Sequence, residues 1–262
     1  MSKTTQKWDK NQEKEFKEKL NKIFNNKIAF AIKKSSKNPL EAGNNLGNLL
    51  KNLDKEIVEI ITPRAVKKWA SSKTIHKWEK ILKDPQMVLE LREIGKSIAN
   101  SMRPIAGNKF ALWVTEILNA YFQIEKISLK AITKGRVKSE LSSKFIRKLK
   151  GGKVTRDYKP DIDIVIIKRN ERNDPVAIIS AKTTLAERIM QTITWHRYLE
   201  SVPEEFSKIK LFLVTAWETF EAGTNKERVQ ELDGVYVCNK NVKEYGKIKL
   251  FSKIGKDLKK LL

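Results

Sequence analysis

The sequence predicts an α/β protein in which a mixed sheet is flanked by helices and preceded by a helical region. Up to about residue 100, apolar residues recur at the three- and four-residue spacing of a helix face. After Gly151-Gly152, they gather instead in short runs rich in β-branched residues, which favours strands. With 262 residues and 40% hydrophobic content, we expect a helical domain over 1–100 and a sheet-bearing domain over 101–262.

Helices account for the first part of the predicted fold. Phe16, Leu20 and Ile23 share one helical face. A second face runs from Leu46 to Ile60, and Pro63 predicts a new helix start because proline suits a helix's first turn. A further helix is expected over 85–100, and a longer one after Gly107. The apolar side of that longer helix comprises Phe110, Trp113, Val114, Ile117, Leu118 and Tyr121.

The strands follow in the second part. The turn residues between the first two runs, RNERNDP, predict a hairpin, and 185–200 has the spacing of a helix between the second and third runs. The expected strands are 162–167, 176–181, 209–216, 234–237 and 248–251.

Charge and composition restrict the possible partners. The chain has 54 Lys+Arg against 31 Asp+Glu, a net charge of +23 that is spread over both halves. Such a surplus attracts a polyanion, namely DNA, RNA or an anionic membrane. No apolar run approaches the roughly 18 residues of a membrane span, and the N-terminus lacks an apolar signal core. We therefore expect a soluble, cytoplasmic protein with no membrane partner. A single cysteine, Cys238, and two histidines exclude an intrachain disulfide, a thiolate zinc site and a multi-histidine site.

An acid and a lysine stand at the ends of two successive predicted strands. Asp161 precedes the first run and Lys182 ends the second, so pairing of these strands would bring the two groups to one edge of the sheet. A carboxylate there can hold Mg²⁺, and a lysine beside it can orient or deprotonate water for phosphodiester hydrolysis. The alternative is a turn aspartate and a solvated lysine, which are common at strand ends.

The surrounding residues resemble a known family. Pro160-Asp161 with Ser180-Ala181-Lys182 resembles the PD…SxK variant of the PD-(D/E)xK nucleases, in which serine replaces the usual acid. The run from Lys182 to Arg188 is similar to that of the EcoRII-like and CCGG-type restriction enzymes. The resemblance implies a restriction-endonuclease-like fold, a metal site at Asp161 and Ala181, and Lys182 as a catalytic residue.

The same resemblance implies which residues contact DNA. It places Glu187 and Arg188 on a helix in the major groove, where Glu can accept from cytosine N4 and Arg can donate to guanine O6 and N7. The alternative is an exposed pair on an amphipathic helix. Family members usually carry a basic residue where Ala186 stands. Lys148 lies in a basic cluster before the motif, well placed for phosphate contact.

A second acid is missing from its usual place. The family carries a second catalytic glutamate about 13 residues after the lysine, where Trp195 stands in this sequence. Three acids are candidates to replace it. Asp163 shares a strand face with Asp161, Glu200 lies one turn beyond His196, and Glu116 lies among apolar residues of the long helix. We favour Glu116 as the third catalytic residue.

The resemblance implies a type II restriction endonuclease that hydrolyses double-stranded DNA with Mg²⁺ at a palindromic, CCGG-containing site. A two-fold target suits a homodimer, which could pair further into a tetramer. Two alternatives stay open: a structure-specific repair or junction nuclease of the same fold, and a non-catalytic DNA-binding protein with a degenerate site.

Overall fold

The computed structural model describes residues 10–35, 37–69, 85–133, 135–144, 162–170, 172–183, 189–200, 208–216, 220 and 224–262. Their contacts divide the chain into two compact units. One consists of Met1–Ala29 with Leu49–Asn108, and the other of Phe30–Asn48 with Lys109–Leu262.

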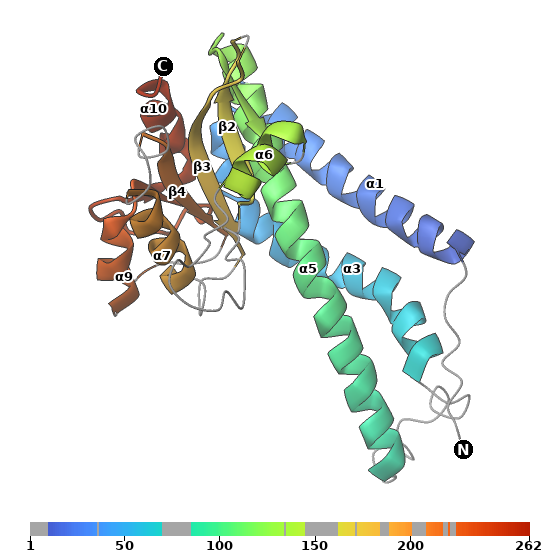
Figure 1. Cartoon of the computed structure of the whole chain (residues 1–262). Coiled ribbons are helices and arrows are strands. Elements are labelled where there is room, and N and C mark those ends of the chain that lie inside the picture. The colour runs from blue at the N-terminus through green and yellow to red at the C-terminus, as the bar shows by residue number, and fades with distance from the viewer. Residues whose placement is uncertain are drawn as a thin grey trace. The chain divides into compact units, whose positions relative to one another are not determined.

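Long helices dominate the N-terminal part of the chain (Figure 1). They are α1 (Lys10–Lys34), α3 (Leu46–Trp69) and α5 (Pro85–Ile124). The predicted restart at Pro63 and the predicted separation at Gly107 are wrong, because α3 and α5 run through them unbroken. A glycine in a helix costs only about 1 kcal/mol, and a side chain at 107 would meet open space rather than a neighbour. Apolar residues buried on both sides of these positions outweigh such local costs, among them Leu53, Ile61, Ile94 and Phe110.

The second unit contains a six-stranded mixed sheet in the order β1-β2-β3-β4-β5-β6. The first three strands pair antiparallel, and β3 to β6 pair parallel. The strands are β1 (Leu129–Ile132), β2 (Ile164–Lys168), β3 (Pro175–Lys182), β4 (Lys210–Thr215), β5 (Gly234–Val237) and β6 (Ile248–Leu250). The predicted fold class, a mixed α/β sheet flanked by helices, is confirmed.

The predicted hairpin joins β2 and β3, with Ile164 opposite Ile179 and Ile166 opposite Ala177. In its turn, the Asn170 side chain donates to Asp174 and accepts that residue's backbone N–H. β1 was not predicted, because four residues of the sequence LKAI carry little strand signal. It is held by Asn119 of α5, whose side chain bonds both the N–H and the C=O of Ala131.

Both faces of the sheet are buried. Leu211, Leu213 and Ile178 point to one face, where they pack with Ile189 and Ile193 of α7 (Ile189–Glu200). The residues of opposite parity on β2 and β3 are equally buried: Ile164, Ile166, Ala177 and Ile179. The remaining helical segments are α2 (Leu40–Gly43), α6 (Arg136–Lys144), α9 (Thr224–Arg228), η1 (Val229–Glu231), η2 (Phe251–Lys253) and α10 (Ile254–Lys259).

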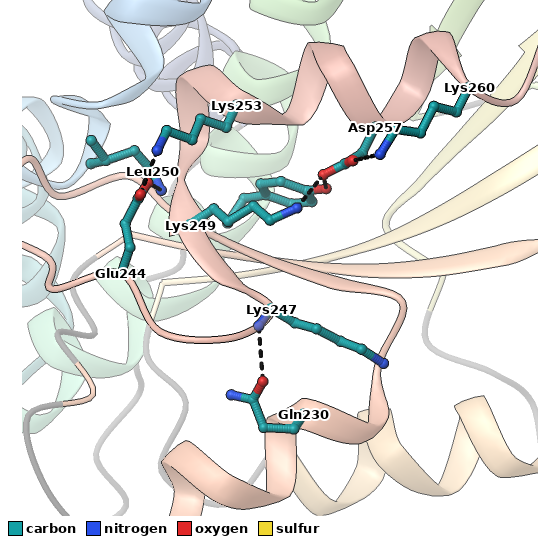
Figure 2. Close-up of polar contacts among 9 residues, drawn as sticks. Gln230, Glu244, Lys247, Lys249, Leu250, Lys253, Asp257 and Lys260 are labelled. Atoms are coloured by element: carbon teal, nitrogen blue, oxygen red, sulfur yellow. Dashed lines mark hydrogen bonds and ion pairs between the residues drawn. The ribbon is translucent and has the colours of Figure 1, made fainter.

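An ion-pair cluster fixes α10 to the last two strands (Figure 2). Asp257 of α10 accepts hydrogen bonds from the Tyr236 hydroxyl of β5 and from Lys249 Nζ of β6, both at 2.7 Å. Lys260 reaches the other carboxylate oxygen at 2.8 Å. Burial opposes ionisation of Asp257, but these donors outweigh it and hold its pKa well below the usual range. The parallel end of the sheet is therefore closed by a helix that is bound through charge as well as packing.

Candidate active site

The described residues include only part of the predicted site. Asp161, Lys148, Glu187 and Arg188 lie outside them. Lys182, Ala181 and Glu116 are described, together with the alternative acids Asp163 and Glu200.

The structure brings Asp163, Ala181 and Lys182 into direct contact where β2 begins and β3 ends. Asp163 Oδ2 lies 2.8 Å from Lys182 Nζ and accepts the Ala181 backbone N–H at 2.8 Å. The Lys182 side chain is 4% exposed and that of Asp163 is 21% exposed. We call these three residues the β2–β3 site. An acid and an ammonium group meet at this edge, as the strand order predicted, but the described acid is Asp163.

The backbone register explains this contact. Ile164 pairs with Ile179, so an extension of β2 by one residue would place Asp163 opposite Ser180. Side chains at alternate positions point to one face, and directly opposed residues share a face. Asp163, Ser180 and Lys182 therefore belong to the same face of the two strands.

The end of the β2–β3 ladder leaves a carbonyl group facing the site. Ala181 donates its N–H to the Asp163 side chain rather than to a β2 carbonyl. Within a strand, a residue's N–H and C=O point to the same edge, so the Ala181 carbonyl also faces β2. The next carbonyl, that of Lys182, faces β4 and accepts the Ala216 N–H at 3.1 Å. Asp163 and the Ala181 carbonyl therefore present oxygen atoms on one side of Lys182.

Ser180 lies behind the β2–β3 site. It occupies the position where the PD-(D/E)xK pattern has its acid, is 4% exposed, and lies with Oγ 3.5 Å from Thr192 Oγ1 of α7. A hydroxyl group adds no negative charge, so a metal centre in this place needs an acid from another element.

A second lysine at the site was not foreseen from the sequence. Lys138 of α6 donates from Nζ to the Asp163 backbone carbonyl at 3.1 Å. Its position in a short lysine-containing helix, 25 residues before Asp163, carries no motif. Lys138 ties α6 to the start of β2 and adds a positive charge beside the acid.

Glu116 lies on α5 with an exposed side chain, between the buried residues Thr115 and Ile117. Asn119, one turn further along α5, bonds to Ala131 of β1. α5 and β1 run in opposite directions from the turn that joins them. One helical turn of about 5.4 Å therefore places Glu116 level with β1 roughly one to two residues beyond Ala131. The first of those residues, Ile132, is opposite Val165, close to the start of β2.

His196 and Glu200 lie at the other end of the sheet. His196 Nε2 is 3.2 Å from Asp233 Oδ2, and its Nδ1 is 3.8 Å from Glu200 Oε1. Asp233 accepts the N–H of Leu211, at the start of β4, whereas Lys182 is in register with Thr215 at its end. Four strand residues, roughly 13 Å, separate these two positions. This geometry excludes Glu200 from a metal centre shared with Asp163 and gives His196 a structural role.

The acid beside His196 makes stability depend on pH. Burial opposes ionisation of Asp233, but hydrogen bonds from His196, the Leu211 N–H and Lys210 outweigh it and lower its pKa to about 2. Because this value lies below the unfolded one of about 3.8, the stabilisation is fully present above pH 4 and is lost as pH falls toward 2.

We therefore expect Asp233→Asn to lower the free energy of unfolding by about 2 kcal/mol at pH 7 and to flatten the acid limb of the stability profile. Urea denaturation between pH 2 and pH 7 measures both effects. Glu227→Gln, on the nearby α9, is the control and should retain the wild-type profile. If the free energy of unfolding of Asp233→Asn fell as steeply toward pH 2 as that of the wild type, Asp233 would not be the source of this pH dependence.

The donor atoms of the β2–β3 site suit a hard divalent cation. Carboxylate and backbone carbonyl oxygens are the ligands that Mg²⁺ prefers. Among the residues that the structure describes, no group of three or more His, Cys, Asp or Glu side chains is arranged to hold a metal. Asp163 and the Ala181 carbonyl thus supply part of a centre, and further acids must complete it. None of the described helices is long and apolar enough to cross a membrane.

Comparison with known proteins agrees with this chemistry. Residues 142–258 match the family model "BsaWI restriction endonuclease type 2". The solved structure "Restriction endonuclease PspGI-substrate DNA complex" is similar over 91% of this chain and 92% of that chain, with 16% sequence identity and a TM-score of 0.48. No curated protein sequence matches. The matched segment contains all of the β2–β3 site. The family that residues 142–258 match is one of type II restriction endonucleases, and the enzyme class of this chain is a type II site-specific nuclease.

Proposed function

We propose that this nuclease hydrolyses both strands of duplex DNA at a palindromic, CCGG-containing site with Mg²⁺ as cofactor. The contact of Asp163 with Lys182 and with the Ala181 N–H carries the catalytic part of the proposal. The CCGG target is supported by the similarity of the run from Lys182 to Arg188 to CCGG-type enzymes. The net charge of +23 supports a strongly anionic substrate.

Each residue of the site has a role in this proposal. Asp161, Asp163, the Ala181 carbonyl and Glu116 would hold Mg²⁺, which polarises the scissile phosphate and lowers the pKa of bound water. Lys182 would orient the attacking water or offset charge in the transition state as an ammonium group, or accept the water's proton as the neutral amine. Its burial fixes the ammonium group within a narrow range of positions, which favours an aligned attack.

Glu116 remains our proposed second acid, and Asp163 joins it. Asp163 is supported by its direct contact with Lys182. Glu116 is supported by its exposed carboxylate on α5, one turn before the residue that binds β1. Together with Asp161, these acids would supply the negative charge that Ser180 lacks.

DNA recognition is assigned to residues outside the described part of the chain. Glu187 would accept from cytosine N4 and Arg188 would donate to guanine O6 and N7, which together read G·C pairs in the major groove. Lys148 would contact a backbone phosphate, which positions the duplex without reading sequence.

The assembly follows from the symmetry of the target. A homodimer places one β2–β3 site on each strand of a palindrome, and pairing of dimers would give a tetramer. The helical part, 1–100, would contribute dimer or DNA-backbone contacts, and 101–262 would carry catalysis. We propose a cytoplasmic location, where host DNA and incoming DNA are both accessible.

Digestion of a plasmid of known sequence tests this proposal. We expect discrete fragments with Mg²⁺, no cleavage with EDTA, and fragment ends that all map to one CCGG-containing palindrome. Cleavage of branched DNA alone would instead support the junction nuclease, and DNA binding without cleavage would support a non-catalytic DNA-binding protein.

In the same assay, Glu116→Gln should raise the Mg²⁺ concentration needed for half-maximal cleavage. Glu125→Gln, whose partner Lys259 lies on the C-terminal helix, serves as its control.

A further inference from the structure

A lysine from the short helix α6 holds the backbone of the acid in the β2–β3 site. Lys138 Nζ donates to the Asp163 carbonyl at 3.1 Å, although the two residues lie 25 positions apart in the chain. Lys138 is half-buried, in contrast to the exposed Lys130 of β1. Ordering a lysine side chain costs conformational entropy, so a fixed position at the backbone of an active-site residue calls for a reason.

The contact lies on the side of β2 that faces β1. The Arg169 N–H donates to the Ser128 carbonyl, so the backbone of Arg169 faces β1. Alternate residues of a strand direct their N–H and C=O groups to the same edge, and the register of β1 with β2 runs unbroken from Lys168 to Val165. The Asp163 carbonyl, next in this alternation, therefore faces the β1 side. The helix that follows β1 along the chain, α6, supplies a donor on this side.

Packing of α6 fixes the place from which Lys138 donates. Leu141 lies three residues further along α6, so the two side chains share one side of the helix. Leu141 is 4% exposed and belongs to the same buried cluster as Val165 of β2. Asp163, two residues before Val165, points to this face by alternation. The buried leucine therefore holds α6 on the face of the sheet that carries the β2–β3 site.

Asp163 is thus held at its backbone and at its side chain by segments distant in sequence. Its backbone carbonyl accepts from Lys138. Its carboxylate accepts from the Ala181 N–H and from Lys182 Nζ, each at 2.8 Å. Active-site groups have to be held within about 0.5 Å of their productive geometry. Because Asp163 precedes the first residue of β2, contacts outside the ladder contribute to the place that its carboxylate takes.

We infer that Lys138 is a positioning residue for cleavage, whose bond to the Asp163 carbonyl sets the place at which the Asp163 carboxylate meets Lys182 and the Ala181 N–H. The inference rests on the proposed function, which gives Asp163 a part in cleavage. Lys138 acts on the reaction through Asp163 and not as a charge that attracts DNA. Its loss should therefore lower the rate of cleavage and leave the affinity for DNA unchanged.

Three variants test this inference: Lys138→Met removes the donor, Lys138→Arg keeps a donor and the charge, and Lys130→Met removes an exposed lysine from the adjacent β1. We expect the single-turnover rate at saturating DNA to fall about ten- to a hundredfold in Lys138→Met, because a small misplacement of an active-site group has an effect of this size. Lys138→Arg should stay within about threefold of the wild type, and Lys130→Met should equal it. DNA affinity in Ca²⁺ should change by less than about twofold in all three variants.

A second measurement needs neither DNA nor metal. In Lys138→Met, hydrogen exchange at the Ala181 amide, followed by NMR, should be at least about fivefold faster because its acceptor is held less firmly. Exchange at the Ile179 amide, which belongs to the β2–β3 ladder opposite Ile164, should keep the wild-type rate. Faster exchange at both amides would indicate general destabilisation and would overturn the inference.

The outcomes separate this inference from the proposed function. Wild-type cleavage by Lys138→Met, an equal loss in Lys138→Arg and Lys138→Met, a loss confined to DNA affinity, or unchanged exchange at Ala181 would each contradict the role of Lys138. If Lys138→Met does not fold, Lys138→Gln, with a shorter side chain, replaces it with the same expected results. A wild-type protein that binds but does not cut DNA defeats the proposed function, and exchange at Ala181 then still decides whether Lys138 holds Asp163.

Discussion

Lys182→Met is expected to lower the rate of DNA cleavage by about 10²–10⁴-fold, the range typical of a positioned proton-transfer group. The ammonium group is buried and bonded to Asp163, so methionine keeps most of the apolar contacts but removes the charge and the donor. DNA affinity in Ca²⁺ should stay within about twofold, because the site-facing lysine is a small part of a strongly basic protein. Single-turnover cleavage and a gel-shift titration measure the two quantities separately.

Lys168→Met is the matched control. Lys168 ends the same β2–β3 pair at its opposite end, where its Nζ lies 3.2 Å from the Leu262 backbone oxygen. Cleavage by this variant should equal that of the wild type. If both lysine variants lost cleavage rate to a comparable degree, the rate would depend on the protein's net positive charge rather than on the β2–β3 site.

Asp163→Asn is expected to abolish cleavage and also to destabilise the protein. The change removes the negative charge that lies 2.8 Å from the buried Lys182 ammonium group and weakens the contact with the Ala181 N–H. A hydrogen bond to a charged group contributes about 1.5–3 kcal/mol, so we expect a loss of this size in the free energy of unfolding. Urea denaturation with and without Mg²⁺ gives the stability, and plasmid cleavage gives the activity.

The double variant Asp163→Asn/Lys182→Met separates the two effects. Removing both members of the ion pair also removes the buried positive charge, so stability should recover part of the loss seen in Asp163→Asn. Activity should not recover at all. Additive losses of stability would show that the two side chains are not coupled, contrary to their 2.8 Å contact.

The central fold could be predicted because its signals are local. The hairpin between β2 and β3 is encoded by two apolar runs and a polar turn, and Lys182 was expected at the strand end where it lies. The match of 142–258 to a restriction-endonuclease family confirms the enzyme class that the Pro160-Asp161 and Ser180-Ala181-Lys182 pattern implied.

The remaining features depend on contacts between distant segments. The sequence pattern pointed to Asp161, but the end of the ladder with β3 brings Asp163 to Lys182 and the Ala181 N–H. Lys138 comes from a helix that carries no motif, and only the folded arrangement brings it to the site. The continuity of α5 was missed because glycine and proline signal local cost but not the packing that exceeds it.

The double hydrogen bond of Asn119 to β1 has a consequence for self-assembly. Outer strands invite another chain to add on, because their unpaired backbone groups offer a template. The amide of Asn119 already occupies the outward N–H and C=O of Ala131, much as a neighbouring strand would. A second copy is thus denied a continuous intermolecular ladder along this border of the sheet.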